Sequence, residues 1–396
     1  MLPTCPVPFS VAPTRHRTIA ALWLVGLSLL AVGCTPEGTV RRPFGLDTSM
    51  NDTAGDDTAG DDTAEVPLQA FSFALFGDNQ FSTTSCTSGT PERMAIPEAI
   101  RDLDPTFVLH TGDLMDHGYE DGAYDHFASC YADLFAETPF FPTAGNHDMG
   151  NGAIWDYKDY LEKQLFIDNP AAWAGDYDAD FTVAYEDDPN AYSTSFSDKT
   201  HLDSVPSGVS WETFYAMKHG NALLISFEQG TRWWSNTPKT WLEGHLAAAK
   251  ADPDIDHVFV TMHHPMYSTK MEEDSDSECV GPVRGYYESL FRDYDVTMVF
   301  AGHTHIYDRF YVPDDGTPTR VLPHPDPYAH DRDAVHYLVS GGGGGPLREG
   351  CDPMPEPREE YSYPYSQARG CGYHFVHVQV VGPALTVRII GVEGSS

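Results

Sequence analysis

Residues 283–309, which read VRGYYESLFRDYDVTMVFAGHTHIYDR, decide the fold. The part up to Tyr294 predicts a helix. The run from Val296 to Phe300 predicts a buried strand, because it is short, apolar and rich in β-branched and aromatic residues. Gly-His-Thr-His follows at 302–305, where the glycine permits a tight turn. Ligands of open α/β sheets bind beyond the carboxyl ends of strands, so His303 and His305 are candidate site residues.

Other short apolar runs along the chain have the same character. The predicted strands are 71–76, 106–109, 140–143, 222–227 and 257–262, and the predicted helices are 91–103, 124–135 and 239–251. Strands that alternate with helices predict an α/β fold. The hydrophobic content of 41% is sufficient for a large core.

Polar side chains of the kind that bind metal ions follow four of these strands. They are Asp78 and Gln80, then Asp113, then Asn146, His147 and Asp148, and finally His263 and His264. Carboxylates, amide oxygens and imidazoles together suit a pair of borderline-hard metals such as Zn, Mn or Fe. Burying so many imidazoles and carboxylates at one point without a metal would be costly. The sequence therefore predicts a metal site at the strand ends.

The order Asp, Gly-Asp, Gly-Asn-His-Asp, His and Gly-His-x-His resembles the calcineurin-like metallophosphoesterases. Within them, the chain is most similar in its motifs to the purple acid phosphatases and related secreted enzymes. The resemblance extends from about Phe71 to Gly343, where LVSGGGGGP at 338–346 is similar to the glycine-rich end of such domains. It implies a domain at 67–396 with a four-layer α/β sandwich, in which two mixed β-sheets are flanked by helices.

The resemblance also assigns the ligands of two metal ions, which would be Fe, Mn or Zn. Asp113 would bridge both metals. The other ligands would be Asp78, Gln80 and His305 for the first metal, and Asn146, His263 and His303 for the second. His110 and His219 are interpreted as structural histidines.

Two positions depart from the family pattern. Gln80 stands where most of the superfamily has His, so a weaker amide ligand or water would complete the first metal. Asp116 stands where the purple acid phosphatases have Tyr. Without that Tyr we expect no purple colour, and Fe(III) is not favoured as the first metal.

The activity implied by the resemblance is hydrolysis of phosphate esters by a metal-bridging hydroxide, most simply of monoesters. His147 would stabilise charge or protonate the leaving oxygen, and Asp148 would orient its ring. Asn146, His147 and His264 would contact the substrate, although His264 is equally compatible with packing. The alternatives are a phosphodiesterase or nucleotidase and, from another class, a non-catalytic surface-binding lipoprotein.

The N-terminus predicts export. Residues 15–34 read RHRTIAALWLVGLSLLAVGC, a basic region followed by an apolar run too short to span a bilayer. The ending LAVGC resembles a lipoprotein cleavage box. We therefore expect a signal peptide at 1–33, a lipid on Cys34 and an extracytoplasmic location at a bacterial outer membrane or cell surface. Ordinary cleavage nearby is the alternative. Residues 34–66, with the repeats NDTAG, DDTAG and DDTAE, predict a solvated acidic linker.

Charge limits the partners. With 23 Lys and Arg against 59 Asp and Glu, the formal net charge is −36, which excludes non-specific nucleic-acid binding. Because metal ions would concentrate positive charge at the site, a small phosphate ester remains a suitable partner.

One further feature is an insertion rich in aromatic residues and Asp. Residues 149–219 are interpreted either as a packed insertion or as a lid over the site, with the lid favoured.

In an oxidising compartment, the five cysteines of the domain allow two disulfides and one free thiol. We expect Cys351 to pair with Cys371, because they flank one Pro-rich loop.

Overall fold

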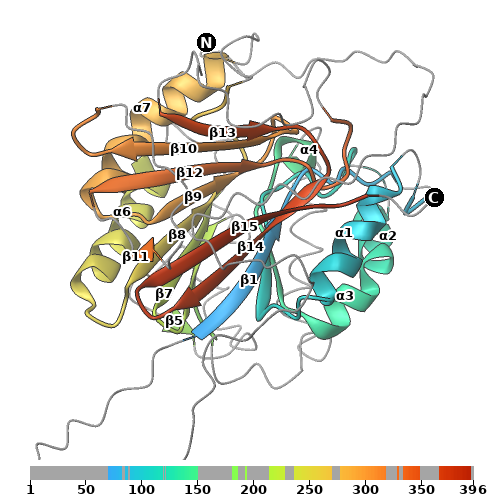
Figure 1. The fold of residues 1–396 in the computed structure, drawn as a ribbon, viewed down its shortest axis with the longest axis horizontal. Helices are drawn as coiled ribbons and strands as arrows, with labels where there is room; N and C mark the ends of the chain where they lie inside the picture. Colours follow the sequence, from blue (N-terminus) through green and yellow to red (C-terminus); the bar gives the residue numbers. More distant parts are fainter. Residues whose placement is uncertain are drawn as a thin grey trace, which may run out of the picture.

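The computed structural model describes nine segments of the chain. They are 70–149 (with gaps at 83–84, 88–89, 119 and 121), 181–185, 192–193, 214–227, 236–269, 277–317, 328–329, 333–347, 365–393 and no others. Two β-sheets lie against each other, with helices on both outer sides (Figure 1). This arrangement confirms the expected α/β sandwich of two mixed sheets flanked by helices.

The six-stranded sheet has the order β11-β15-β14-β1-β2-β3. Its strands are β1 (Ala70–Phe76), β2 (Phe107–His110), β3 (Phe140–Pro142), β11 (Tyr328–Ala329), β14 (His374–Val381) and β15 (Ala384–Gly391). β1, β2 and β3 are parallel, whereas β14 pairs with β1 in the antiparallel direction. The three parallel strands therefore point their carboxyl ends to the same edge.

The nine-stranded sheet has the order β13-β10-β12-β9-β8-β7-β6-β4-β5. Its strands are β4 (Phe181–Tyr185), β5 (Tyr192–Ser193), β6 (Phe214–His219), β7 (Ala222–Phe227), β8 (His257–Thr261), β9 (Met298–Ala301), β10 (Tyr307–Pro313), β12 (Ala334–Ser340) and β13 (Ser366–Gly370). β7, β8, β9 and β12 form its parallel centre. β4, β5 and β6 show that part of the 149–219 insertion extends this sheet. The other residues of the insertion lie outside the described ones, and so the lid stays a prediction.

Helices cover the outer faces of both sheets (Figure 1). They are α1 (Glu92–Arg101), α2 (Ala123–Cys130) and α3 (Ala132–Glu137) on one side, and α6 (Asn236–Ala251) and α7 (Ser277–Asp293) on the other. The short helix α4 (Asn146–Met149) follows the end of β3. The single helix predicted at 124–135 is wrong, because it divides at Tyr131 into α2 and α3. The backbone of Tyr131 leaves the helical region with φ −103° and ψ 17°, while its buried hydroxyl donates a hydrogen bond to Arg93 O.

Aromatic side chains fill the space between the sheets. The ring of Phe73 on β1 lies 5.3 Å from that of Phe259 on β8 and 6.0 Å from that of Phe300 on β9. All three side chains are fully buried. Removing one such ring costs roughly 3–5 kcal/mol, because the cavity left behind collapses only in part. This core fixes how the strand ends of the two sheets meet.

The predicted N-terminal features lie outside the described residues. These are the signal peptide at 1–33, the lipid on Cys34 and the acidic linker at 34–66. Among the segments that the structure describes, no helix has both the length and the apolarity needed to cross a membrane.

The structure shows one disulfide that the sequence analysis did not assign. Cys86 forms a disulfide with Cys130, a pair that the sequence did not indicate. Cys371 is also disulfide-bonded, but Cys351 is not among the described residues. The Cys351–Cys371 pair therefore stays a prediction.

Candidate metal centre

The site residues lie where the strands of the two sheets end. Asp78, Asp113 and Asn146 follow β1, β2 and β3, whereas His263 follows β8, and His303 and His305 follow β9. Asp78, Gln80, Asp113, His303 and His305 have φ angles of 61°, 43°, 58°, 70° and 50°. Side chains other than glycine seldom adopt this left-handed conformation, and residues held in it cluster at functional sites. These five are among only eight such residues in the described part of the chain.

The ligand atoms form two groups that share one carboxylate. Asp78, Asp113 and His305 make one group, and Asp113, His263 and His303 make the other, with the ligand atoms of each group within 4.8 Å of one another. His305 Nε2 lies 3.4 Å from Asp78 Oδ1, and His263 Nε2 lies 3.4 Å from Asp113 Oδ2. Two ligands of one tetrahedral zinc ion are separated by about 3.4 Å, given metal–ligand bonds of about 2.1 Å. The residues therefore fit two cations, with Asp113 between them.

The two amide side chains assigned as ligands also lie at these groups. Asn146 Oδ1 is 3.0 Å from His263 Nε2 and 2.8 Å from His303 Nδ1. Gln80 Nε2 is 3.3 Å from Asp113 Oδ2. The structure thus brings together every residue that the sequence assigned to the metals.

Glycines allow the loops to approach the carboxylates closely. A Cβ atom on Gly145 would lie 2.1 Å from Asp113 Oδ1, and one on Gly302 would lie 2.3 Å from Asp78 Oδ2. Both distances are far below van der Waals contact. The glycine of each motif is therefore needed for space beside a ligand.

Backbone carbonyls orient two of the imidazoles. His263 Nδ1 donates to Thr111 O at 2.8 Å, and His305 Nδ1 donates to Pro346 O at 2.5 Å. When Nδ1 carries the proton, Nε2 is left free to bind a metal. Thr111 and Pro346 lie in the loops after β2 and β12, so both sheets help to orient the ligands.

The site concentrates charge in a buried place. Asp78 and Asp113 are 0% and 1% exposed. Burial is the largest single influence and opposes a charge on His263. The charge and hydrogen bond of Asp113, the charge of Asp78 and the bond to Thr111 O together raise the pKa of His263 to about 9. Burial and the neighbouring His264 and His263 lower the pKa of His303. Buried carboxylates are stable only when paired, and cations between them supply that pairing.

His147 faces this site from the side. Its Nε2 lies 3.9 Å from Asp113 Oδ2, and its Nδ1 donates to Asp116 O at 2.6 Å. The Asp116 carboxylate is 3.5 Å from the same Nδ1. Burial works to lower the pKa of His147, but the charges of Asp113 and Asp116 and the hydrogen bond to Asp116 raise it above its ordinary value.

The predicted role of Asp148 in orienting His147 is wrong. The Asp148 carboxylate accepts backbone N–H bonds from Asp113 and Gly145 at 2.8 and 2.9 Å, and the Tyr124 hydroxyl at 3.1 Å. Because α4 begins at Asn146, the side chain of Asp148 turns back towards this backbone. Asp148 therefore ties the Gly-Asp motif at 112–113 to the Gly-Asn-His-Asp motif at 145–148. Asp116 holds His147 instead. The sequence signal for Asp116 was its spacing of three residues from Asp113.

His264 packs behind the ligands. Its ring lies 4.3 Å from the ring of His303 and 5.2 Å from that of His263, and it is 8% exposed. Burial, followed by the charge of His263, lowers the pKa of His264 to about 3. These contacts correspond to the packing alternative, and substrate contact by His264 stays a prediction.

Asp308, which the sequence did not single out, joins the two histidine-bearing loops. Its buried carboxylate accepts the backbone N–H of Thr269 at 2.8 Å and the Ser268 hydroxyl at 3.2 Å. Thr269 lies six residues after His263, and Asp308 lies three residues after His305. Burial raises the pKa of Asp308 to about 7. We interpret Asp308 as a clamp that holds the two loops at a fixed separation.

Comparison with known proteins places the chain among phosphoesterases. The sequence profile of the calcineurin-like phosphoesterase family matches residues 71–307. An uncharacterized protein of Mycobacterium tuberculosis is 29% identical over 270 residues, which are 64% of this chain and 45% of that protein. A purple acid phosphatase of Glycine max is 27% identical over 224 residues, covering 55% of this chain and 46% of that enzyme. The chain thus spans about half the length of the curated relatives it matches.

A solved structure supports the fold. The purple acid phosphatase from yellow lupin seeds superimposes with a TM-score of 0.54 at 18% identity, covering 83% of this chain and 53% of that one. At this identity the likeness concerns the fold alone. It agrees with the two sheets and flanking helices described above.

Proposed function

This chain belongs to the calcineurin-like phosphoesterase family, and from that premise we propose that it is a dimetal-dependent phosphomonoesterase. The observation that carries the proposal is the shared position of Asp113 in two groups of ligand atoms. A single buried carboxylate between two sets of imidazole and oxygen donors suits two adjacent cations. When bound, such a pair supplies Lewis acidity that activates water and neutralises charge on a phosphoryl group.

The chain's own residues hold and orient this centre. Asp78, Gln80 and His305 would hold one cation, and Asn146, His263 and His303 would hold the other. Thr111 O and Pro346 O fix the tautomers of His263 and His305, so that Nε2 of each faces the centre. Asp148 holds the Asp113 backbone against Gly145, which keeps the shared carboxylate in place.

His147 is placed to supply a proton. Its Nδ1–H is bound by Asp116 O, so Nε2 is the atom that faces Asp113 and the reaction space. The raised pKa favours the protonated ring, which can give its Nε2 proton to a leaving oxygen. His147 is thus left for proton transfer, and His263, His303 and His305 for metal binding.

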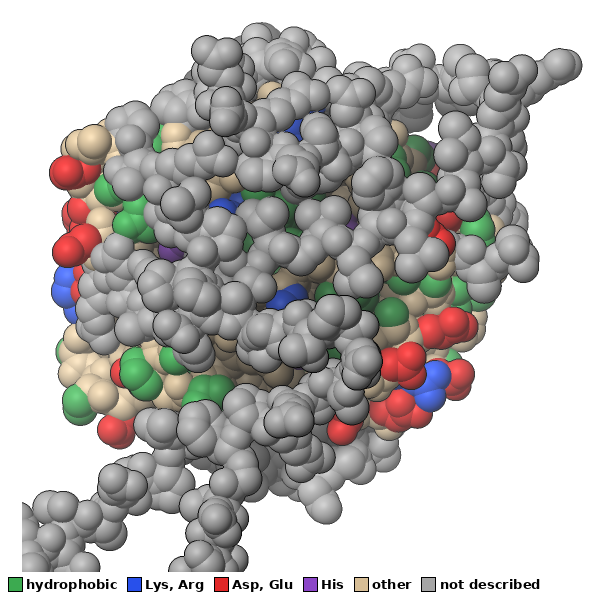
Figure 2. All heavy atoms as spheres, viewed as in Figure 1, with side chains coloured by type: hydrophobic (Ala, Val, Ile, Leu, Met, Phe, Trp, Pro, Cys, Tyr) green, Lys and Arg blue, Asp and Glu red, His purple; other side chains and the backbone are tan. Residues whose placement is uncertain are grey.

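The substrate we propose is a small phosphate monoester. Relatives of this chain include a purple acid phosphatase and a phosphoenolpyruvate phosphatase of Allium cepa, and the names of both support a phosphatase activity. Acidic side chains gather along the margins of the face shown in Figure 2, which disfavours a long polyanion. The cations would be Zn, Mn or Fe, without the purple colour, because Asp116 replaces the Tyr that produces it.

We further propose that the enzyme works outside the cytoplasm, attached to a membrane by a lipid on Cys34. The signal-like sequence at 15–34 and the acidic linker support this location. Labelling with a radioactive fatty acid tests it: wild-type protein should carry the label and Cys34→Ala should not. Label on the variant would contradict the anchor.

The activity is tested with two chromogenic esters. Purified protein loaded with Zn²⁺ or Mn²⁺ should release p-nitrophenol faster from p-nitrophenyl phosphate than from bis(p-nitrophenyl) phosphate. The reverse preference would indicate a phosphodiesterase. Binding of two cations without turnover of either ester would overturn the enzymatic proposal in favour of a binding role.

A further inference from the structure

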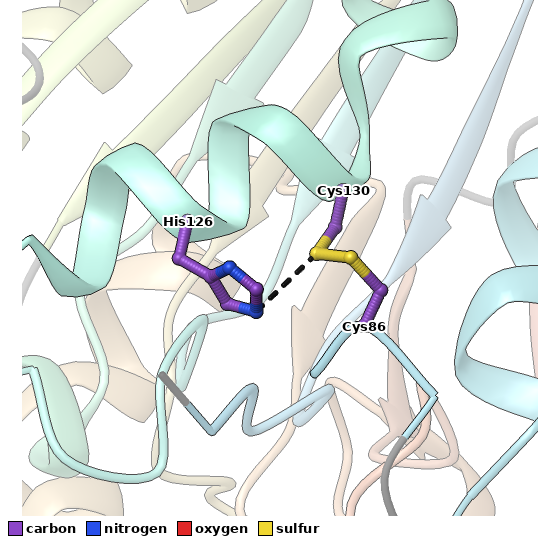
Figure 3. A group of neighbouring side chains, drawn as sticks. All are labelled: Cys86, His126 and Cys130. Atoms are coloured by element: carbon purple, nitrogen blue, oxygen red, sulfur yellow. Dashed lines mark hydrogen bonds between the residues drawn. A yellow bond between two sulfur atoms is a disulfide. The ribbon is translucent and has the colours of Figure 1, made fainter. Parts of the chain in front are cut away.

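The disulfide between Cys86 and Cys130 lies beside a histidine. Cys86 belongs to the loop after β1, and Cys130 is the last residue of α2. His126 stands one helical turn before Cys130, and Figure 3 shows its ring directed at the sulfur atoms. His126 Nε2 is 3.6 Å from Cys130 Sγ. One ligand atom from each of the three residues falls within 4.8 Å of the others.

The separation of His126 from Cys130 corresponds to that of two ligands in a tetrahedral zinc site. With Zn–S of about 2.3 Å and Zn–N of about 2.1 Å, a thiolate and an imidazole on one zinc ion lie about 3.6 Å apart. The observed distance from His126 Nε2 to Cys130 Sγ has this value. The spacing of His126 and Cys130 at i and i+4 places both on one face of α2. Half of the site is thus already arranged for a metal.

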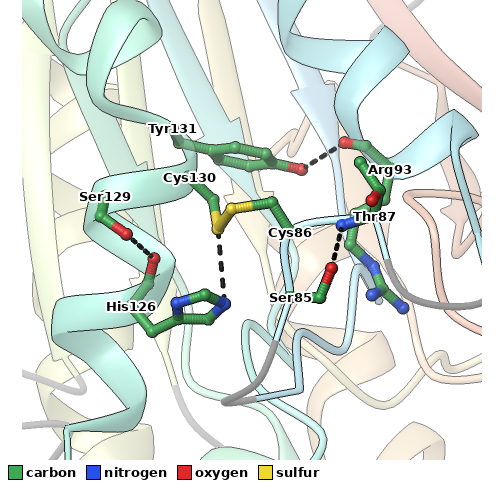
Figure 4. The surroundings of a disulfide bond; sticks show 8 residues. All are labelled: Ser85, Cys86, Thr87, Arg93, His126, Ser129, Cys130 and Tyr131. Atoms are coloured by element: carbon green, nitrogen blue, oxygen red, sulfur yellow. Dashed lines mark hydrogen bonds between the residues drawn. A yellow bond between two sulfur atoms is a disulfide. The ribbon is translucent and has the colours of Figure 1, made fainter.

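His126 and Cys130 are held by α2, whereas Cys86 lies in the loop after β1, outside any helix or long strand. Figure 4 shows Ser129 Oγ donating to His126 O within α2, and the hydroxyl of Tyr131, the residue after the helix, donating to Arg93 O, which anchors the end of α2 that carries Cys130. Cys86 lies in a turn whose hydrogen bond runs from the Thr87 N–H to Ser85 Oγ at 3.2 Å. Two thiolates on one zinc ion lie about 3.8 Å apart, so the loop must move Cys86 by about 2 Å after reduction.

We propose that reduction of this disulfide creates a second kind of metal site, in which Cys86, Cys130 and His126 bind Zn²⁺ or a similar thiophilic cation. Three protein ligands leave the fourth position for water. The site shares no residue with the Asp113-centred groups. It also differs in chemistry, since thiolates select softer cations than carboxylates do.

An external phosphine supplies the two electrons that reduce the disulfide. The phosphine attacks one sulfur, the S–S bond breaks, and water converts the phosphine to its oxide while both sulfurs become thiols. Binding of Zn²⁺ then releases two protons as the thiols become thiolates. Oxidation and metal binding therefore compete for the same two sulfurs, and bound metal protects them from reoxidation. Both the disulfide and a bound metal ion would connect Cys86 to α2.

Cobalt(II) is the probe, because thiolate-to-cobalt charge transfer absorbs in the near-ultraviolet and ligands without sulfur give no such band. Full-length protein is reduced with tris(2-carboxyethyl)phosphine, desalted without oxygen and titrated with Co²⁺. We expect one equivalent per chain to produce the band in reduced protein and none in oxidised protein. Excess Zn²⁺ should abolish the band.

Two variants identify the ligands. Cys86→Ser/Cys130→Ser retains every other cysteine and should give no band under reduction. His126→Gln keeps both thiols and should weaken Co²⁺ binding by about tenfold or more, because it removes one of three ligands. A band of equal intensity in the double variant, no band in reduced wild type, or unchanged affinity in His126→Gln would each overturn the site. None of these readouts depends on phosphatase activity.

Discussion

The two sheets make different contributions to the candidate metal centre. The six-stranded sheet supplies oxygen donors, because β1, β2 and β3 are followed by Asp78, Asp113 and Asn146. The nine-stranded sheet supplies nitrogen donors, because β8 and β9 are followed by His263, His303 and His305. Neither sheet alone carries a complete set of ligands for either group.

The centre is therefore also a joint between the sheets. Each group of ligand atoms takes at least one carboxylate from the six-stranded sheet and at least one imidazole from the nine-stranded sheet. A cation bound there links two layers that are otherwise joined by apolar packing such as Phe73 against Phe259. Metal binding should therefore stabilise the folded protein as well as activate it.

The largest expected effect comes from the carboxylate that both groups share. Asp113→Asn removes its negative charge with little change in shape. We expect phosphatase activity to fall by about a thousandfold or more, since several kcal/mol of transition-state stabilisation are lost. Turnover of p-nitrophenyl phosphate measures this. Asp133→Asn, at a well-exposed carboxylate of α3, is the matched control and should keep wild-type activity. Near-normal turnover by Asp113→Asn would show that the two sheets do not share a centre.

His147→Gln separates proton transfer from metal binding. Loss of a general acid should lower kcat by about a hundredfold to ten-thousandfold. The number of bound cations should stay at that of wild type, because His147 belongs to neither group around Asp113. Kinetics combined with metal analysis by mass spectrometry checks both statements. A fall in metal content would instead make His147 a ligand.

Asp116→Asn tests which carboxylate acts on His147. The change removes a negative charge 3.5 Å from His147 Nδ1 but keeps the backbone carbonyl that binds it. A nearby carboxylate favours the charged imidazolium, so its loss should lower the pKa of His147. The alkaline limb of the kcat/KM profile should then move to lower pH, with a loss of activity of about tenfold or less. An unmoved limb would mean that Asp116 acts only through its backbone.

The smallest expected effect is on stability, at the clamp between the two histidine loops. Burial raises the pKa of Asp308 to about 7, so the folded protein keeps a proton that the unfolded chain releases from about pH 4 upwards. The stability from this group is present below about pH 4 and is lost as pH rises through about 7. Asp308→Asn lacks the titration. Urea unfolding measures the free energy of unfolding of both proteins. The value for wild type minus that for the variant should fall by about 1 kcal/mol or more between pH 5 and 8. A constant difference would contradict the raised pKa.

Most of the centre could be predicted from the sequence, because each ligand follows directly after a buried strand. Parallel strands bring such residues to one edge, and so Asp78, Asp113 and His263 meet as expected. The partner of His147 could not be predicted, since Asp116 and Asp148 both stand near it in the motifs. Only the start of α4 at Asn146 decides that Asp148 turns towards the backbone.

Other features depend on distant contacts. The break at Tyr131 arises where its hydroxyl reaches Arg93 on α1, which a helical pattern does not reveal. The Cys86–Cys130 pair depends on how the loop after β1 lies against α2. Sequence spacing alone carries no information about that approach.

The most direct test of the shared centre is titration of metal-free protein with Zn²⁺, followed by calorimetry and thermal unfolding. Two equivalents of Zn²⁺ should bind per oxidised chain. At a free concentration of about a hundred times Kd, each bound cation should stabilise the fold by about 2.7 kcal/mol. In Asp113→Asn at most one equivalent should bind with comparable affinity. Binding of two equivalents with unchanged affinity and stabilisation in Asp113→Asn would contradict the claim that one carboxylate joins both cations and both sheets.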